Sequence, residues 1–137
     1  MAHSRSGFSL MEIMIAIAII SLMLGVAGPF LMKQYQKAKV SKARTELRGI
    51  QDAINQFNID TNRNPSSLKD LVKRPTDENL ARRWDGPYLK QKTVPQDPWG
   101  NKYKYQLTPD AQHPYELSSR GPSGGGKKSA MSVWDED

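Results

Sequence analysis

The sequence predicts an α+β fold, in which a long N-terminal helix packs on short helices and a small antiparallel sheet. Three observations predict it. A nearly uncharged apolar stretch opens the chain and leads directly into a helical stripe of apolar residues. Turn-forming residues end that stripe near Pro65. Short segments in which apolar and polar residues alternate, as they do in strands, then follow towards the C-terminus.

The apolar stretch runs from Phe8 to Met32 and carries one charged residue, Glu12. A bilayer core needs roughly 20 apolar residues in a helix, so this stretch can span a membrane. A cleaved secretory signal is the alternative, but its apolar region would run for only about 7–15 residues. Because the stretch is longer and helical periodicity continues past it, we expect a retained anchor.

Glu12 is the most informative residue of this stretch, because a carboxylate in apolar surroundings is costly unless it has a partner. An ionisable residue at membrane depth is a functional-site hypothesis by default. The alternative is that Glu12, which is close to the helix start, reaches the lipid headgroups. From the residues alone, both interpretations stand.

A helix break is predicted at Gly25, Gly28 and Pro29. Proline lacks an N–H, and its ring crowds the carbonyl of the residue four positions earlier. An interior proline costs about 3 kcal/mol and each glycine up to ~1 kcal/mol, so local melting or a kink requires little further energy. The alternative is a tolerated kink, which is common in membrane helices.

The helix is expected to continue beyond the membrane as an amphipathic spine. Its apolar stripe recurs at alternating spacings of three and four and comprises Val40, Ala43, Leu47, Ile50, Ile54 and Phe57. The stripe is too short for a lone coiled coil, so we expect it to face a globular core.

The remaining elements are short. Ser66 or Ser67 can cap a helix through Val72, with Asp70 completing a capping box, and a further helical turn is expected near Asp77. The segment 97–100, Asp-Pro-Trp-Gly, has the signature of a type I turn, beside which its tryptophan is expected to pack on the core. Three alternating segments are expected as strands, the first two forming a looped hairpin: Lys102–Leu107, Tyr115–Ser118 and Met131–Trp134.

Composition limits the classes of function. The chain has no cysteine, which excludes disulfides and thiol chemistry. Its net charge of +6 is spread along the predicted helix and strand faces, which is typical of a solvated surface. His3 and His113 do not combine with a serine and an aspartate into a catalytic set, so the sequence does not predict an enzyme.

The segment Gly7-Phe8-Ser9-Leu10-Met11-Glu12, placed before a long apolar helix, resembles the processing signature of type IV pilins and pseudopilins. The stretches Trp84–Lys90 and Pro95–Tyr103 narrow the resemblance. With the short body, they look like the major pseudopilins of the bacterial type II secretion system, the general secretion pathway protein G family. The likeness covers roughly residues 5–107 well and the C-terminal end poorly.

The resemblance implies a leader peptide at residues 1–7, a transmembrane and assembly helix at 8–32 and a soluble domain at 33–137. Prepilin peptidase would cut between Gly7 and Phe8 and methylate the Phe8 amine. The protein would pass once through the inner membrane with its body in the periplasm. Copies would polymerise into a pseudopilus that drives protein export across the outer membrane. Further expected partners are minor pseudopilins and the inner-membrane assembly platform, with no specific nucleic acid.

Two consequences concern charge. Cleavage would create a cationic amine on Phe8, with which the Glu12 of a neighbouring subunit can pair. The periplasmic placement conflicts with the charge bias around the apolar stretch. The positive-inside rule alone would leave the body in the cytoplasm, because basic residues are concentrated after the apolar stretch. These residues are Lys33, Lys37, Lys39, Lys42 and Arg44.

The C-terminal loop departs from the family pattern. Major pseudopilins commonly hold calcium there through aspartates, and calcium prefers six to eight oxygen ligands, several of them carboxylates. Here the segment 119–134 contains no Asp or Glu, and it carries Arg120, Lys127 and Lys128. We therefore expect no cofactor, with the loop either held by lysine–carboxylate contacts or mobile.

Two other filament functions are alternatives. A pilin-like subunit for DNA uptake or binding is compatible with the +6 charge, which allows nonspecific phosphate contacts. A type IV pilin for adhesion is the other, although such pilins carry a C-terminal cysteine pair that is missing here. We favour the pseudopilus subunit, because it explains Glu12, the cut site and the long helix together.

Overall fold

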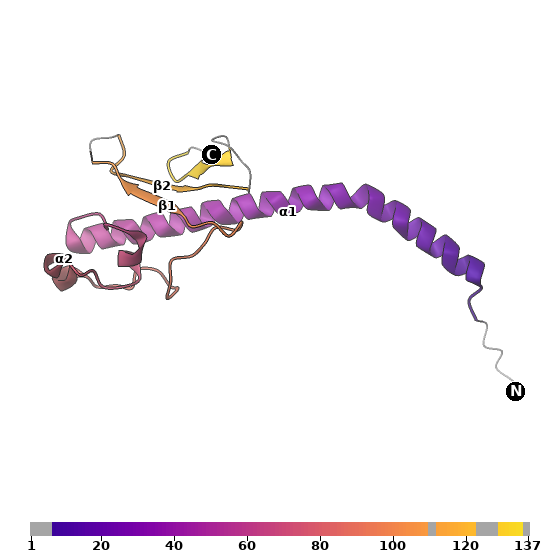
Figure 1. Ribbon diagram of the computed structural model, residues 1–137, viewed down its shortest axis with the longest axis horizontal. Coiled ribbons are helices and arrows are strands. Elements are labelled where there is room, and N and C mark those ends of the chain that lie inside the picture. Colours follow the sequence, from indigo (N-terminus) through magenta and orange to yellow (C-terminus); the bar gives the residue numbers. More distant parts are fainter. Residues whose placement is uncertain (1–6, 110–111, 123–128, 136–137) are drawn as a thin grey trace, which may run out of the picture. The chain divides into compact units, whose positions relative to one another are not determined.

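The computed structural model describes residues 7–109, 112–122 and 129–135. These residues divide into two compact units, the first ending at Ala38 and the second beginning at Lys39. The predicted α+β fold is confirmed, with its elements in the predicted order (Figure 1). They are the helix α1 (Leu10–Thr61), the 3-10 helix η1 (Leu68–Leu71), the helix α2 (Glu78–Arg83) and the strands β1 (Lys104–Leu107), β2 (Tyr115–Ser119) and β3 (Met131–Ser132). Residues 123–128 of the C-terminal loop lie outside the described residues.

The C-terminal half of α1 buries one face, as the apolar spacing predicts. Its fully buried side chains include the predicted stripe from Ala43 to Phe57, and Ala53 joins them. Val40 lies half-buried at the edge of the stripe. The helix ends at Thr61, whose hydroxyl donates to the carbonyl of Phe57 at 2.7 Å. Asn62 follows in the left-handed region, which asparagine tolerates better than most residues.

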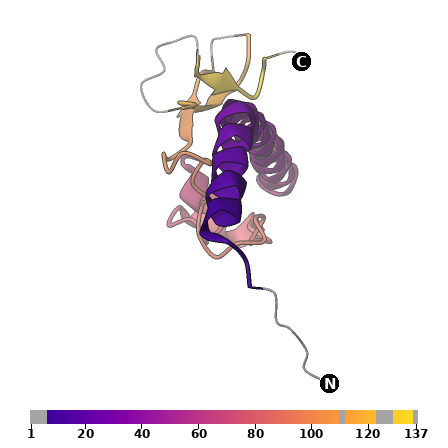
Figure 2. The same cartoon turned by 90° about the vertical axis from the view of Figure 1, so that its right-hand side faces the viewer.

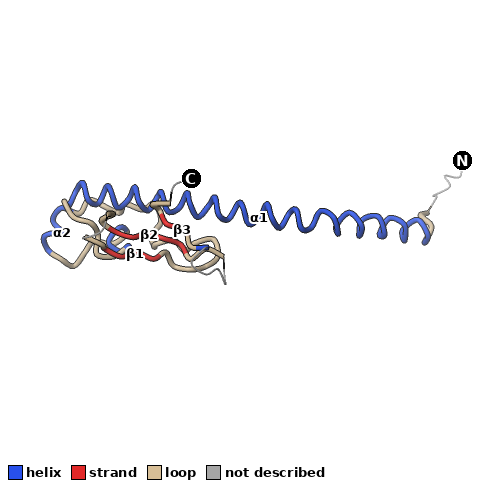
Figure 3. Tube along the Cα trace, turned by 90° about the horizontal axis from the view of Figure 1, so that it is seen from above, coloured by secondary structure: helices blue, strands red, loops and turns tan. Residues whose placement is uncertain are grey.

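The described strands form one antiparallel sheet in the order β1-β2-β3, drawn in red beside the C-terminal half of α1 in Figure 3. Figure 2 shows the chain turned by 90° from the view of Figure 1. The central strand β2 alternates as predicted, with Tyr115, Leu117 and Ser119 buried. β3 is shorter than predicted, although the Val133 amide still donates to the Leu117 carbonyl. Leu107, at the hairpin end of β1, is 42% exposed, although the Tyr115 with which it pairs is buried.

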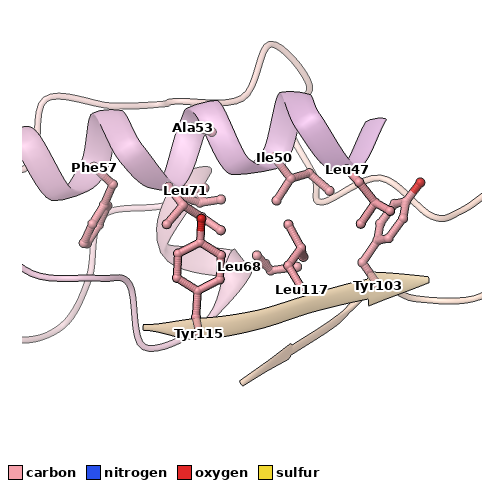
Figure 4. Packing of buried hydrophobic residues seen from close by; sticks show 10 residues of the cluster. Leu47, Ile50, Ala53, Phe57, Leu68, Leu71, Tyr103, Tyr115 and Leu117 are labelled. Carbon is pink, nitrogen blue, oxygen red and sulfur yellow. The ribbon is translucent and has the colours of Figure 1, made fainter. Parts of the chain in front are cut away.

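The core lies between α1, η1 and the sheet (Figure 4). Side chains of α1 face aromatic and leucine side chains of the strands, with two leucines of η1 beside them. The buried cluster is Leu47, Ile50, Ala53, Ile54, Phe57, Leu68, Leu71, Tyr103, Tyr115 and Leu117. Each large apolar side chain buried in it contributes about 1.5–3 kcal/mol.

Side-chain caps fix the two short helices where the sequence predicts them. Ser67 accepts from the Lys69 amide, and the Asp70 carboxylate accepts from the Ser66 and Ser67 amides, so the capping box is confirmed. Asp77 caps α2 by accepting from the amides of its first turn.

The segment before β1 is held by hydrogen bonds between residues far apart in the sequence. The Trp84 indole donates to the Asp70 carbonyl at 2.7 Å, and the Tyr88 hydroxyl donates to Asp60 at 2.8 Å. A β-turn at residues 97–100 is confirmed by the Gly100 amide, which donates to the Asp97 carbonyl. The placement of Trp99 differs from the prediction: Trp99 stays half-buried at the turn, while Trp84 and Trp134 pack against the core cluster.

Candidate functional site

The N-terminal end of α1 is fixed by Ser9. The Ser9 hydroxyl accepts from the Glu12 amide at 3.2 Å, and the Ser9 carbonyl accepts from the Ile13 amide at 3.2 Å. Ser9 is therefore the N-cap and Glu12 the third helical residue. The Ser-x-x-Glu pattern formed by Ser9 and Glu12 is the local sequence signal for this cap.

Glu12 lies in the first turn of α1 with its side chain exposed. A carboxylate is favourable there, because the first turn carries unpaired N–H groups and the positive end of the helix dipole. Within the described part of the chain, its carboxylate forms no ion pair. A cation from outside these residues can therefore approach it without displacing a described partner.

Gly7 and Phe8 lie in the non-helical segment before the cap. Phe8 is 80% exposed, and no atom lies within 4 Å of the position that a Cβ on Gly7 would take. The peptide bond between Gly7 and Phe8 is thus accessible. Phe8 lies four positions before Glu12 in the sequence. The structure places these residues at one end of α1 without assigning them a role.

The surface that follows is apolar and uncovered. From Phe8 to Tyr35 the large hydrophobic side chains are exposed, with Leu10 at 79% and Val26 at 77%. α1 is long and apolar enough to cross a membrane, and the most apolar part of it is unburied. Ser21 satisfies its hydroxyl inside the helix by donating to the Ile17 carbonyl at 2.8 Å. An apolar surface of this extent requires lipid or other protein chains to cover it.

At Gly25, Gly28 and Pro29, where melting or a kink is predicted, α1 remains helical, and its N-terminal half bends (Figure 1). α1 is assigned as one helix through all three residues. The reason is that proline removes a single intrahelical hydrogen bond, and the apolar turns on both sides continue the helix past it. No atoms lie within 4 Å of Cβ positions on Gly25 and Gly28. That this segment opens during assembly stays a prediction.

The contacts of His113 and Tyr88 in the described part of the body are structural ones. His113 stacks on Trp134 with ring centroids 4.2 Å apart and planes 6° apart, which is a packing contact. Among the described residues, no three His, Asp or Glu side chains gather closely enough to hold a metal ion. Burial raises the pKa of Tyr88 to about 12, and its hydroxyl serves the structural bond to Asp60.

A long N-terminal helix with an exposed apolar end, an acidic residue in its first turn and a second half packed on a small antiparallel sheet defines the class of pilin-like subunits. The family model described as "Prokaryotic N-terminal methylation motif" matches residues 2–28. The family model described as "Type II secretion system (T2SS), protein G" matches residues 30–134. The chain belongs to the type II secretion system protein G family. The resemblance inferred from the sequence is confirmed.

Individual relatives agree. The type II secretion system core protein G of Pseudomonas aeruginosa is 36% identical over 142 residues, covering 97% of each chain. The protein of the same name from Escherichia coli K12 is 34% identical over 124 residues, covering 88% of this chain and 83% of the relative. The crystal structure of the major pseudopilin of enterohaemorrhagic Escherichia coli superposes with a TM-score of 0.61, at 29% identity, covering 76% of this chain and 93% of that one. These matches do not favour DNA uptake or adhesion.

Proposed function

We propose that the chain is a structural subunit of the pseudopilus of a bacterial type II secretion system, which polymerises to drive proteins across the outer membrane. One observation carries the proposal: the N-terminal part of α1 exposes a continuous apolar surface whose only charge is Glu12. A surface of this kind suits storage in a membrane and burial against other copies. The family membership and the named relatives support the same function.

Processing provides the positive charge that assembly needs. Prepilin peptidase cuts between Gly7 and Phe8 and methylates the new amine, which is consistent with the methylation motif at residues 2–28. The exposure of Phe8 ahead of the Ser9 cap leaves that bond open to a protease. The methylated amine remains a cation.

Glu12 then selects the register between subunits. A carboxylate and an amine that enter apolar surroundings together cancel each other's charge, whereas either one alone is strongly destabilising. Pairing of Glu12 with the Phe8 amine of a neighbouring copy therefore favours one axial position over its neighbours. Local opening at Gly25, Gly28 and Pro29 lets the helix adjust as it leaves the membrane.

The remaining assignments follow from this assembly. The helix at residues 8–32 anchors the subunit in the inner membrane before polymerisation, with the body in the periplasm. Minor pseudopilins, the assembly platform and prepilin peptidase are the protein partners. In this role the subunit itself is structural and carries no catalytic activity.

Mass spectrometry of the protein extracted from membranes tests the processing step. The expected mature chain begins at Phe8 and carries one methyl group on its amine. A chain in working filaments that still begins at Met1 would contradict the proposal, because no amine would then stand near Glu12.

Substitution of Glu12 tests the assembly step. Glu12→Gln and Glu12→Ala are expected to reach the membrane in normal amounts and to form few or no filaments. Ser21→Ala is the matched control, because it removes another polar group from the same apolar stretch without removing a charge. Membrane fractionation measures insertion and electron microscopy measures filaments. Filaments of normal length and number from Glu12→Ala would exclude the charge-pairing mechanism.

A further inference from the structure

A buried carboxylate links the turn before β1 to the end of β2. Asp97 is 4% exposed. Its Oδ1 accepts from the Trp99 amide at 3.1 Å and the Asn101 amide at 2.8 Å, which fixes the turn. Its Oδ2 accepts from the Ser119 hydroxyl at 2.7 Å. Three donors thus stabilise a charge that would otherwise be costly to bury.

Ser119 extends this chain of hydrogen bonds to the C-terminal segment. It is the last residue of β2 and is 1% exposed. While its hydroxyl donates to Asp97, its oxygen accepts from the Gly121 amide at 3.0 Å. We call this chain of hydrogen bonds, formed by Asp97, Ser119 and Gly121, the Asp97 latch. It ties the start of the C-terminal loop to a turn 22 positions earlier than Ser119.

The same residues close the loop at its base. Gly121 has φ +73°, and a Cβ added to it would overlap the carbonyl oxygen of Ser129, so the chain on the two sides of the loop is in close contact. Ser119 also pairs with Met131 of β3. The segment therefore returns directly to the strand end that the latch holds.

Beyond β3, the chain is fixed by further direct contacts. The Val133 amide donates to the Leu117 carbonyl at 2.9 Å, and the Trp134 indole donates to the Tyr115 carbonyl at 2.9 Å. Trp134 also lies against the rings of Tyr115 and His113. The C-terminal segment is thus anchored by protein groups on each side of the loop.

This region does not fit the calcium ion that the family commonly holds in its C-terminal loop. The segment 119–134 offers no carboxylate, and its charged residues are cations. The nearby Asp97 carboxylate already accepts three hydrogen bonds from protein donors, and the backbones of Gly121 and Ser129 are in contact. A calcium ion needs several free oxygen ligands, which these groups do not provide.

We propose that the Asp97 latch takes the place of a metal ion in this protein, holding the C-terminal segment on the sheet so that the body is ordered without calcium. If the proposed function holds, the filaments then assemble without calcium as well. The latch itself depends only on the folded body, so the two proposals can fail separately.

Hydrogen–deuterium exchange of the full mature chain in mild detergent tests the latch. In the unsubstituted protein, millimolar calcium and a calcium chelator are expected to give the same exchange in peptides covering 117–122 and 131–134, and the same unfolding midpoint. Ser119→Ala removes both hydroxyl bonds and is expected to speed exchange there by roughly tenfold or more. Ser118→Ala, which removes one hydroxyl from the neighbouring position of β2, is the control and is expected to leave exchange unchanged.

Asp97→Asn separates the latch from a general loss of folding. An asparagine keeps an acceptor for the turn amides but loses the charge, so intermediate protection is expected, with the exchange of α1 unchanged. Slower exchange or a higher midpoint on adding calcium would overturn the proposal, and so would unchanged exchange in Ser119→Ala. Filament assembly measured in chelator then tests the second part: normal filaments support it, and calcium-dependent filaments from a protein with a calcium-independent body contradict only that part.

Discussion

A hydrogen bond to a charged group connects α1 with the chain just before β1, and its contribution to the free energy of unfolding can be worked out and measured. The Tyr103 hydroxyl donates to Glu46 Oε2 at 2.6 Å, and Tyr103 is 6% exposed. Burial, and then the hydrogen bond to Glu46, raise the pKa of Tyr103 well above its ordinary value. The hydroxyl therefore remains a donor through the pH range in which a free tyrosine would ionise.

Tyr103→Phe keeps the ring in the core and removes only this bond. Hydrogen bonds to charged groups contribute about 1.5–3 kcal/mol. The Glu46 side chain is 23% exposed and lies 3.8 Å from the Lys42 ammonium, so water and Lys42 replace part of the lost interaction. We therefore expect the free energy of unfolding to fall by about 1.5 kcal/mol.

The matched control is Tyr105→Phe. The Tyr105 hydroxyl donates to the neutral Pro65 carbonyl at 2.7 Å, so its loss is expected to cost about 1 kcal/mol or less. Urea unfolding in mild detergent measures both, followed by the fluorescence of the three tryptophans, which all lie in the body. A double-mutant cycle with Glu46→Gln isolates the pair. If Tyr103→Phe costs no more than Tyr105→Phe and the coupling energy is zero, the reasoning is refuted.

Three further predictions use the same unfolding measurement or a pH titration. Leu117→Ala, at a side chain that is 0% exposed, is expected to cost about 2–5 kcal/mol, and a loss below 1 kcal/mol would mean that the core is not packed as described. Gly86→Ala is expected to cost about 1–3 kcal/mol because its Cβ would lie 2.6 Å from the Trp84 ring, whereas Gly49→Ala, with no atom within 4 Å, is expected to stabilise by up to about 1 kcal/mol; equal effects would contradict this. The pKa of Tyr88 is raised from 10.0 to about 12, so its contribution to stability is complete below pH 10 and is lost as the pH rises towards 12. A tyrosinate absorbance titration is expected to show this tyrosine ionising after the others, together with a loss of tryptophan fluorescence. Ionisation of Tyr88 near pH 10 would contradict the prediction.

Local signals in the sequence account for most of the fold. The spacing of Leu47, Ile50 and Phe57 fixes the buried face of α1, and the capping residues Ser67 and Asp77 fix where the short helices begin. Each of these signals acts within a few residues, so the sequence contains it directly. The turn at Asp97 is predictable for the same reason.

Contacts between distant residues could not be predicted in this way. The bond from Ser119 to Asp97 joins residues 22 positions apart, and the bond from Tyr103 to Glu46 joins residues 57 positions apart. No local pattern specifies which polar side chains meet across the core. The same limit explains Trp99, since the choice of which tryptophan covers the core depends on how the loops return to it.

The candidate site was predictable in part. Glu12 stands out because a lone charge in an apolar stretch is rare, and its position in the first turn is seen in the structure. The Ser9 cap is also encoded locally, by the serine three positions before Glu12. At Pro29 the sequence indicates a weak point of the helix but not whether it melts or bends, because residue propensities give the cost of a proline and not the response of the neighbouring turns.

The strand order makes β1, which carries Lys104, one edge strand of the sheet. The other edge strand is β3, which has only two residues. An open strand margin is a template for pairing with another chain, and short length or a lysine discourages that pairing. Bodies crowded together at high local concentration are thereby protected from fusing into a continuous intermolecular sheet. Backbone ladders between molecules are difficult to dissolve, so this protection keeps contacts between copies reversible.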